Sequence, residues 1–291
     1  MQSDFPKKRH IKVSVAIPAS LVSDIPHLRE KTLRIGLIGR ALAIFRVNEI
    51  IVYPDIPGQD QTRDAGLIKA ILSYMETPQY LRRRLFKIRP ELRYVGILPP
   101  LRTPHHPTRN KEKDLKIGEY REGVVVSSDE RGIHIDIGVE RPLFVPDVRM
   151  KTNSRVTVRI REKERHLIGN LVDPEEIKVY WGYRVNVSEF SLGRLMKDQR
   201  YDLIIATSRR GDPFMNVADE LLDEWKRSTR ALIAFGSPTR GLQEILEQES
   251  VNLERAAHFI VNTVPNQGVK TVRTEEALYA TLAVLNILSS E

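Results

Sequence analysis

Residues 261–277, "VNTVPNQGVKTVRTEEA", join a short apolar run to a helix through a long polar connection. The run ends at Val264, Pro265 and Gly268 interrupt the backbone, and Thr274 precedes two acidic residues that favour the start of a helix. A connection of this kind usually takes about 2 to 6 residues, whereas this one takes about nine, from Pro265 to Arg273. Its length and polar composition predict that it holds a ligand.

The rest of the chain alternates between short β-branched runs and longer runs with helical spacing. The alternation predicts an α/β fold. We expect strands at residues 11–17, 49–53, 94–98, 183–188, 202–208, 231–237 and 258–264. We expect helices at residues 28–45, 66–75, 78–88, 192–197, 217–226 and 275–288, and one that begins at residue 242.

Residues 115–175 differ from the rest, because short alternating runs are separated by turn residues. In "GIHIDI" (132–137), the three isoleucines fall on one side of a strand, and His134 and Asp136 fall on the other. About five such strands predict a small all-β barrel of the oligonucleotide-binding (OB) type. We therefore expect one discontinuous α/β domain, residues 1–108 and 178–291, interrupted by this inserted OB-like barrel.

The joint before the barrel, "RTPHHPTRNKEKD" (102–114), contains the histidine pair His105 and His106. No carboxylate and no second histidine pair lies near them at the spacing of a metal site. The sequence therefore predicts an exposed linker here, and it predicts no metal.

Composition limits the possible chemistry and points to a partner. The chain has 291 residues and no cysteine, which excludes disulfides and mechanisms that begin with a cysteine thiolate. Residues 1–116 hold 22 Lys and Arg against 11 Asp and Glu, whereas the remaining 175 residues hold 24 against 27. Because such segregated positive charge can displace counterions from phosphates, we expect a nucleic-acid partner. No run approaches the ~18 apolar residues of a membrane span, and no signal peptide is evident, so we expect a cytoplasmic protein with no membrane partner.

Three of the expected strands end in polar or glycine-containing loops: "IIATSRRGDP" (204–213), "AFGSPTRGL" (234–242) and the connection quoted first. In open α/β sheets, ligands bind beyond the carboxyl ends of the strands, where backbone amides and helix N-termini converge. The three loops therefore predict one binding site. The sequence has no G-x-G-x-x-G after its first strand, no Walker A motif and no H-E-x-x-H motif, so dinucleotide-binding, NTPase and zinc-protease functions lose support.

Two of these loops resemble a known family. "FGSPTRGL" (235–242) and "NTVPNQGVKTVRTEEAL" (262–278) are similar to the cofactor loops of the SPOUT (α/β-knot) superfamily of RNA methyltransferases. The segment "RIGLIGRALAIFRVNEIIVYPD" (34–55), and a barrel inserted between "GILPPL" and "WGYRVNVS", narrow the resemblance to the archaeal and eukaryotic RNA uridine-N3 methyltransferase branch.

The resemblance implies a SPOUT-type α/β domain with a C-terminal trefoil knot, a homodimer, and S-adenosyl-L-methionine bound by the three loops. Main-chain groups near Val264 and Gly268 would contact the adenine, while glycines would allow close approach and prolines would keep the loops rigid. The residues implied for cofactor binding are Thr207, Gly236, Ser237, Pro238, Gly241, Leu242, Asn262, Thr263, Val264, Pro265, Gln267, Gly268 and Thr271.

The helix expected at residues 28–45 carries a cation on its apolar side. Arg34 falls within the apolar face that is formed by Leu37, Ile38, Ala41, Leu42 and Phe45. Because an unpaired buried cation is costly, Arg34 either pairs with an acid, reaches water or contacts an anion. Arg34 and Arg40 are our candidate catalytic residues, and Arg40 stands at a family-like position.

Other cations are candidates for RNA contact: Arg46, Arg63, Lys69, Arg82, Arg83, Arg84, Arg155, Arg159 and Arg273. Arg273 is also a candidate for an interface ion pair. In the barrel, Phe144 is nearly the only aromatic side chain expected to be available for base stacking.

These features favour an S-adenosylmethionine-dependent RNA methyltransferase that modifies a base, uridine N3, in ribosomal RNA. Two alternatives stay open: a non-catalytic RNA-binding or ribosome-assembly factor that retains the knotted fold, and a ribose 2′-O-methyltransferase. In a weaker interpretation, the barrel docks a protein and the charge serves solubility.

Overall fold

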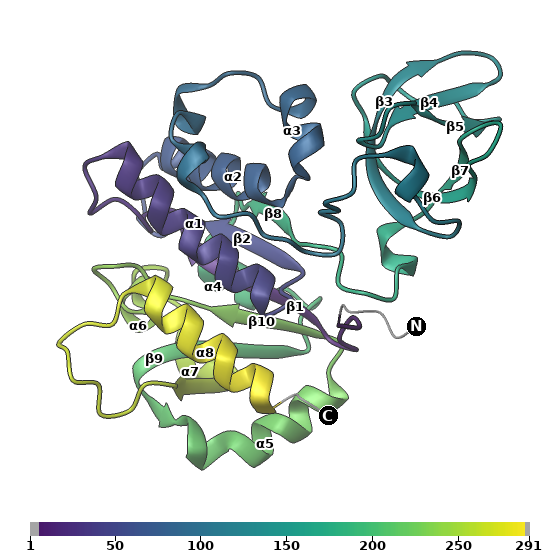
Figure 1. The fold of residues 1–291 in the computed structure, drawn as a ribbon. Helices are drawn as coiled ribbons and strands as arrows, with labels where there is room; N and C mark the ends of the chain where they lie inside the picture. The colour runs from purple at the N-terminus through teal and green to yellow at the C-terminus, as the bar shows by residue number, and fades with distance from the viewer. Residues whose placement is uncertain (1–5, 289–291) are drawn as a thin grey trace. The chain divides into compact units, whose positions relative to one another are not determined.

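The computed structural model describes residues 6–288, and its central element is a six-stranded parallel sheet. The strand order is β11-β9-β10-β1-β2-β8 (Figure 1). β1 pairs with β10, and β2 pairs with β8, so strands from before and after the insertion share one sheet, as the sequence predicts. The strands are β1 (Lys12–Pro18), β2 (Glu49–Tyr53), β8 (Arg184–Val187), β9 (Leu203–Pro213), β10 (Arg230–Ala234) and β11 (Phe259–Asn262).

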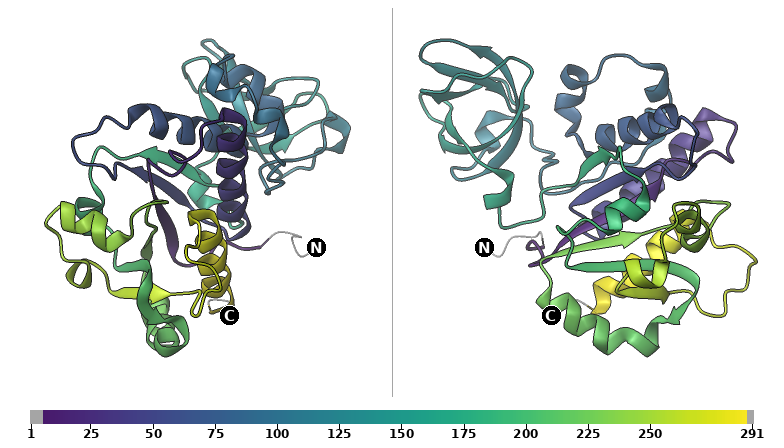
Figure 2. Two further views of the ribbon diagram at one scale, coloured as in Figure 1. Left: turned by 90° about the vertical axis from the view of Figure 1, so that its left-hand side faces the viewer. Right: turned by 180° about the vertical axis from the view of Figure 1, so that it is seen from behind.

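Helices cover both faces of this sheet (Figure 2). On one face α1 (Leu28–Ile44) packs against α8 (Thr274–Leu288). On the other lie α4 (Leu192–Met196), α6 (Leu242–Gln248) and α7 (Leu253–Ala256), while α5 (Phe214–Arg227) contacts β9 and β11. The helix α2 (Thr62–Glu76) precedes the short α3 (Gln79–Leu85).

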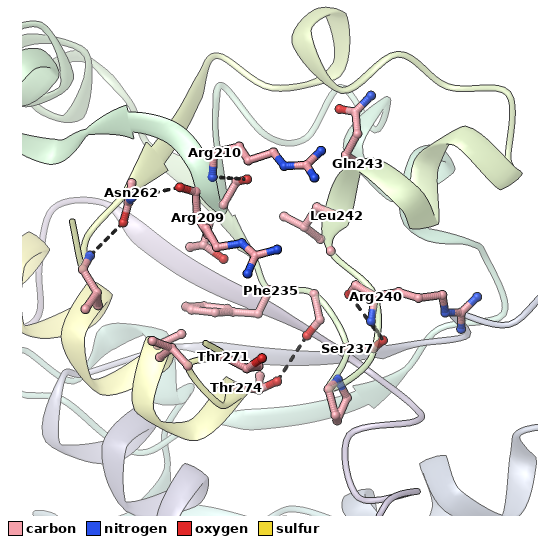
Figure 3. A pocket seen from close by; sticks show the side chains of 18 of the residues that line it. Arg209, Arg210, Phe235, Ser237, Arg240, Leu242, Gln243, Asn262, Thr271 and Thr274 are labelled. Carbon is pink, nitrogen blue, oxygen red and sulfur yellow. Dashed lines mark hydrogen bonds between the residues drawn. The ribbon is translucent and has the colours of Figure 1, made fainter. Parts of the chain in front are cut away.

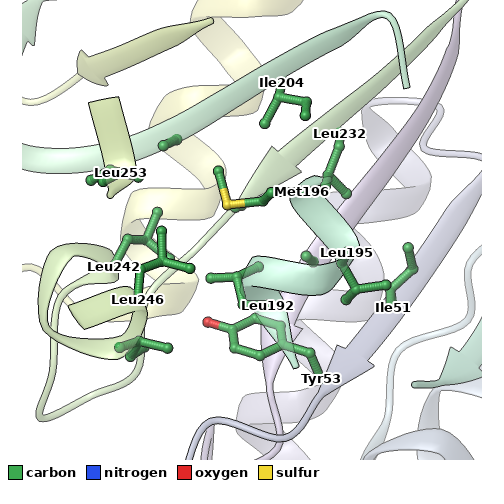
Figure 4. Close-up of a cluster of buried hydrophobic side chains, with 14 of the residues drawn as sticks. Ile51, Tyr53, Leu192, Leu195, Met196, Ile204, Leu232, Leu242, Leu246 and Leu253 are labelled. Atoms are coloured by element: carbon green, nitrogen blue, oxygen red, sulfur yellow. The ribbon is translucent and has the colours of Figure 1, made fainter. Parts of the chain in front are cut away.

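A buried apolar cluster joins α4, α6 and α7 to the sheet (Figure 4). Leu192 and Leu246 are fully buried in it, together with Tyr53 from the end of β2. The Tyr53 hydroxyl donates a hydrogen bond of 2.7 Å to the Phe235 carbonyl, so its polar tip is satisfied. This cluster fixes the carboxyl end of β2 beside the loop that follows β10.

The inserted segment forms a closed five-stranded barrel with the order β3-β4-β5-β7-β6. The alternation predicted from the sequence is confirmed, because Ile133, Ile135 and Ile137 are buried in its core, whereas His134 and Asp136 are half-buried. The strands are β3 (Tyr120–Ser128), β4 (Gly132–Asp136), β5 (Leu143–Pro146), β6 (Arg155–Glu162) and β7 (Ile168–Leu171).

Three local predictions are wrong. Residues 94–98 form no strand; Val95–Ile97 are a 3-10 turn, and β8 occupies the sheet edge beside β2. A five-residue run of this kind, which ends at Pro99, cannot be assigned by periodicity alone. Residues 209–213, expected in a loop, continue β9, and β11 pairs with Asp212 and Pro213 after a register shift. On α1, Leu37 was expected on the buried face but is 43% exposed.

Two compact units divide the described chain. One consists of residues 6–8, 74–89 and 100–182, and the other of residues 9–73, 90–99 and 183–288. The sheet lies in the second unit and the barrel in the first. The domain boundaries expected from the sequence remain predictions.

Within the barrel-containing unit, a buried polar network replaces the exposed linker that the sequence predicts at the histidine pair. His105 is fully buried, and its Nε2 lies 3.0 Å from a carboxylate oxygen of Glu76. Arg155 on β6 bonds to Glu76 at 2.6 Å and to Glu122 at 2.7 Å. Trp181 also donates to Glu122, at 2.6 Å. The joint is therefore folded rather than exposed, because its histidines hydrogen-bond to Glu76, whose carboxylate pairs with Arg155 on the barrel.

The network shifts two pKa values downward. Burial alone would raise the pKa of Glu76, but Arg155 and His105 more than offset it and hold the pKa at about 2. Burial, reinforced by the nearby His105, lowers the pKa of His106 to about 3. The His106 Nε2 lies 2.6 Å from the Glu76 carbonyl, so the neutral ring can donate a hydrogen bond there.

We predict acid-induced destabilisation of this unit in two overlapping windows. In the unfolded chain His106 takes up a proton near its ordinary pKa of 6.5, whereas the folded chain does so only near 3. Stability from His106 is thus present above pH 6.5 and is lost as the pH falls toward 3, by at most about 1.4 kcal/mol per pH unit. Protonation of Glu76 adds a further loss of stability as the pH falls from its ordinary pKa of 4.5 to about 2. Urea unfolding followed by circular dichroism measures the free energy of unfolding at each pH. In His106→Gln, this free energy should depend less on pH between 6.5 and 3. An unchanged pH profile in that variant would contradict the assignment.

Candidate functional site

A cavity of about 270 Å³ lies at the carboxyl ends of β9, β10 and β11 (Figure 3). Its size is near the lower end of the range for small-molecule pockets. Three segments contribute its walls: the second half of β9, the loop after β10, and the connection between β11 and α8. The carboxyl ends of these three strands thus meet at one site, which is the arrangement that the loops predict.

Most of the residues implied for cofactor binding line this cavity. They are Thr207, Gly236, Ser237, Pro238, Gly241, Leu242, Asn262, Thr263, Val264, Gln267 and Thr271. Pro265 and Gly268 do not line it, although they lie in the same connection. A Cβ atom on Gly268 would meet no protein atom within 4 Å, so a side chain at this position would not clash with the rest of the protein.

The loop after β10 is a compact turn held by its own hydrogen bonds. The Ser237 amide donates to the Arg240 carbonyl at 2.9 Å, and the Arg240 amide donates to the Ser237 hydroxyl at 3.0 Å. A Cβ atom on Gly236 would lie 2.9 Å from the Arg240 carbonyl oxygen and 3.3 Å from the Leu242 amide nitrogen. Because these neighbours are backbone atoms, the turn closes only with glycine at position 236.

A buried carboxylate holds this turn from the outside. Asp55, which is 1% exposed and lies just after β2, accepts hydrogen bonds from the amide and the hydroxyl of Ser20 and from the Gln61 side chain. Arg240 reaches the same carboxylate at 3.1 Å. The cavity wall is therefore fixed to the first half of the chain by a buried ion pair.

The connection between β11 and α8 is tied to β9 and to the turn. Asn262 donates to the Arg209 carbonyl at 3.0 Å, and the Arg209 guanidinium donates to the Lys270 carbonyl at 3.0 Å. The Thr274 hydroxyl donates to the Gly236 carbonyl at 3.3 Å. The long polar connection thus has its own internal partners and one contact with the opposite wall.

The lining combines apolar surface with cations. Phe235 and Leu242 supply apolar side chains, and Figure 3 shows Arg209 and Arg210 extending from β9 toward the loop after β10. Such a lining suits a ligand that has a flat apolar part and an anionic group. Of these side chains, sequence reasoning singled out only Leu242. Arg209 and Arg210 were missed because the sequence placed them in a loop, where side-chain directions cannot be deduced. In a strand, side chains point alternately to the two sides.

Arg34 pairs with two acidic side chains. Its guanidinium lies 2.9 Å from Asp24 and 3.2 Å from Glu275, in the first turn of α8, and its side chain is 12% exposed. This matches the alternative in which a cation on the apolar side pairs with an acid. Arg40 is half-buried on the same helix. Neither residue lines the cavity.

The structure separates the cations proposed for RNA contact into two groups. Several already bond to protein groups: Arg46 to Asn286, Arg82 to the Thr77 and Met75 carbonyls, Arg84 to Asp136, and Arg155 to Glu76 and Glu122. Burial also lowers the pKa of Arg46. The others are exposed: Arg63, Lys69, Arg83, Arg159 and Arg273.

Within residues 6–288, no cluster of three or more acidic or histidine side chains is arranged to hold a metal ion. In the same range, no helix has the length and apolar character needed to span a membrane.

Comparison with known proteins gives four results. The family described as "Putative RNA methyltransferase" matches residues 12–285. An uncharacterized protein of Haloarcula marismortui is 34% identical over 94% of this chain and 98% of that protein. A protein of Homo sapiens named 28S rRNA (uridine-N(3))-methyltransferase is 33% identical over 95% of this chain and 78% of that protein. A solved methylase family protein of Neisseria gonorrhoeae, 11% identical over 100% of this chain and 87% of that chain, has a TM-score of 0.36, which is too low to compare the folds.

We predict that Asp55→Ala lowers the free energy of unfolding by about 3 to 5 kcal/mol, because it leaves Arg240 and the donors of Ser20 and Gln61 without their acceptor. Asp219→Ala, at an exposed position on α5, is the matched control and should change stability by less than about 0.5 kcal/mol. Urea unfolding measures both. Equal effects of the two variants would show that the buried pair does not hold the turn.

Proposed function

The chain belongs to the family described as "Putative RNA methyltransferase", and from this we propose that it transfers a methyl group from S-adenosylmethionine to N3 of a uridine in ribosomal RNA. The observation that carries the proposal is the cavity at the ends of β9, β10 and β11, between the Gly236 turn and the connection to α8. The uridine and the ribosomal RNA are carried over from the named relative.

The lining fits the proposed cofactor. When bound, S-adenosylmethionine supplies an electrophilic methyl group. Phe235 and Leu242 would pack against its apolar parts, and Arg209 or Arg210 would pair with its carboxylate. The turn at Gly236 lets the backbone approach closely, and its hydrogen bonds are already made, so little entropy is lost when a ligand binds.

The acceptor must be made nucleophilic by the protein. Uridine N3 is an imide nitrogen that must lose its proton before methyl transfer, and a cation beside O2 or O4 would stabilise the resulting anion. Arg40 is our candidate for this role. Because Asp24 and Glu275 already compensate its charge, we assign Arg34 to positioning, where it ties α1 to the first turn of α8. The composition excludes attack by a cysteine, since the chain has none.

We also propose that the chain threads through itself to form a trefoil knot. Two observations support this: β11 lies at the sheet edge beside β9, and the chain then returns so that Thr274 bonds to the Gly236 carbonyl and α8 packs on α1. Tracing the backbone in a crystal structure would test it: a C-terminal segment that does not pass through a loop of the preceding chain would contradict the knot.

A homodimer is the proposed assembly. On α1, Leu33, Leu37 and Ile44 are 47%, 43% and 51% exposed, and on α8 Ile287 is 75% exposed. These side chains give the paired helices an apolar surface that a second copy would cover.

Methyl transfer from labelled S-adenosylmethionine into ribosomal RNA, followed by mass analysis of the nucleosides, tests the function. We expect 3-methyluridine. A 2′-O-methylated nucleoside would instead support the ribose reaction, and cofactor binding with no transfer to any RNA would support the RNA-binding factor.

We predict that Gly236→Ala weakens cofactor binding at least tenfold, because the added Cβ displaces the turn. Gly66→Ala, in α2 where a Cβ atom would meet nothing within 4 Å, is the control and should bind as wild type. Titration calorimetry measures both. Wild-type binding by Gly236→Ala would place the cofactor elsewhere.

We predict that Leu37→Glu makes the protein monomeric in sedimentation velocity, because a charge would be buried in the proposed interface. Met215→Glu, at another strongly exposed apolar side chain (82%), should leave the assembly unchanged. A dimer that survives Leu37→Glu would place the interface on another surface.

A further inference from the structure

One row of side chains crosses three strands on the outside of the barrel. Tyr120 on β3 pairs in register with Arg159 on β6, and Arg159 pairs with Asn170 on β7. Paired residues point to the same side of a sheet. The next strand positions, Arg121 and Val158, are buried. The row of Tyr120, Arg159 and Asn170 therefore faces outward, where Arg159 and Asn170 are exposed and Tyr120 is half-buried.

Two further side chains extend this row into a strip. The ring of Trp181 lies 6.1 Å from that of Tyr120, edge to face, and its indole N–H is fixed by Glu122. Arg161, two positions after Arg159 on β6, donates to the Asn170 side chain at 3.3 Å. We name Trp181, Tyr120, Arg159, Asn170 and Arg161 the aromatic–arginine strip.

The arginines of the strip differ from three other arginines on the barrel. Arg141 pairs with Glu112, Arg149 pairs with Glu130, and Arg155 pairs with two carboxylates. Among the residues that the structure describes, neither Arg159 nor Arg161 has an ion-pair partner, and both are exposed. The guanidinium of Arg159 lies 5.8 Å from the centre of the Tyr120 ring. The strip thus combines uncompensated positive charge with an aromatic surface.

We propose that the aromatic–arginine strip binds single-stranded RNA. A base stacks on Tyr120, neighbouring phosphates contact Arg159 and Arg161, and the Asn170 amide hydrogen-bonds to a base edge. The proposal rests on the proposed function only in taking RNA as the substrate, since the strip does not line the cavity. It adds a second binding site for RNA, on the barrel.

The chemistry favours RNA over a protein partner. Single-stranded nucleic acid is bound by aromatic rings for its bases and cations for its phosphates, and the strip has both within one row. Sequence reasoning left Phe144 as nearly the only aromatic side chain for stacking, because the pairing of β3 with β6 and the position of Trp181 cannot be deduced from spacing. Strand register places Tyr120 beside an arginine.

The test uses the full chain and a labelled single-stranded RNA of about twelve nucleotides, within the site sizes of small barrels. Fluorescence anisotropy should show binding that weakens about tenfold in Tyr120→Ala and stays near wild type in Tyr120→Phe, because stacking needs only the ring. Arg159→Ala should weaken binding and reduce the slope of log affinity against log salt by about 0.7, the loss of one phosphate contact. Arg149→Ala removes the same charge at a paired, exposed position on the barrel and is the matched control.

Tryptophan emission gives an independent readout. The chain has two tryptophans, and Trp225 is buried at 2% exposure, so Trp225→Phe leaves Trp181 as the only reporter. Added RNA should quench Trp181, and Tyr120→Ala should reduce the quenching at equal RNA concentration.

Unchanged affinity in both Tyr120→Ala and Arg159→Ala, or unchanged Trp181 emission at saturating RNA, would overturn the proposal and favour a protein-docking role for the barrel. Cofactor calorimetry on the same variants separates this outcome from failure of the proposed function. Strip variants should bind S-adenosylmethionine as wild type, whereas an inactive cavity would fail to bind it in the wild-type protein too.

Discussion

The parallel pairing of β1 with β10 and of β2 with β8 is the constraint on which the site depends. Each pair joins a strand from before the barrel to a strand from after it. Because all six strands run in one direction, their carboxyl ends meet at one edge of the sheet, and the loops there become the cavity wall. The ion pair between Asp55 and Arg240 follows from this pairing, since β2 ends beside the turn that follows β10.

The sequence predicts the strands of the sheet and the barrel well where apolar and polar residues alternate over several positions. Ile133, Ile135 and Ile137 alternate with polar residues, and one strand is the only simple way to bury them together. Residues 94–98 lack such support, because five apolar residues suit a strand or a turn equally. Residues 209–213 have no apolar side chain that would predict a strand, and they continue β9 where β11 pairs with Asp212 and Pro213, a tertiary effect that the local pattern does not contain.

The loops predicted where the candidate site lies, beyond the carboxyl ends of three strands, but not which side chains contact one another there. The family resemblance implied Gly236, Asn262 and Thr271 for cofactor binding, and these residues line the cavity. The sequence did not identify the partners of Arg34, which could pair with an acid or bind an anion. Only the fold brings Asp24 and Glu275 to its guanidinium. The same holds for His105: the sequence predicts an exposed linker there, and only the fold brings its ring to Glu76, which pairs with Arg155.

Net charge is a poor guide to where RNA would bind, because ion pairing removes many of the cations from consideration. Arg155 and Arg159 lie four residues apart on β6 and have opposite environments: one is held by Glu76 and Glu122, and the other faces solvent beside Tyr120. Since strand residues with an even separation share a face, sequence spacing treats the two alike. What separates them is the position of two carboxylates, Glu76 at the end of α2 and Glu122 on β3, which both pair with Arg155. The electrostatic surface that meets RNA is therefore set by packing, and only the uncompensated cations contribute to the counterion release that drives binding.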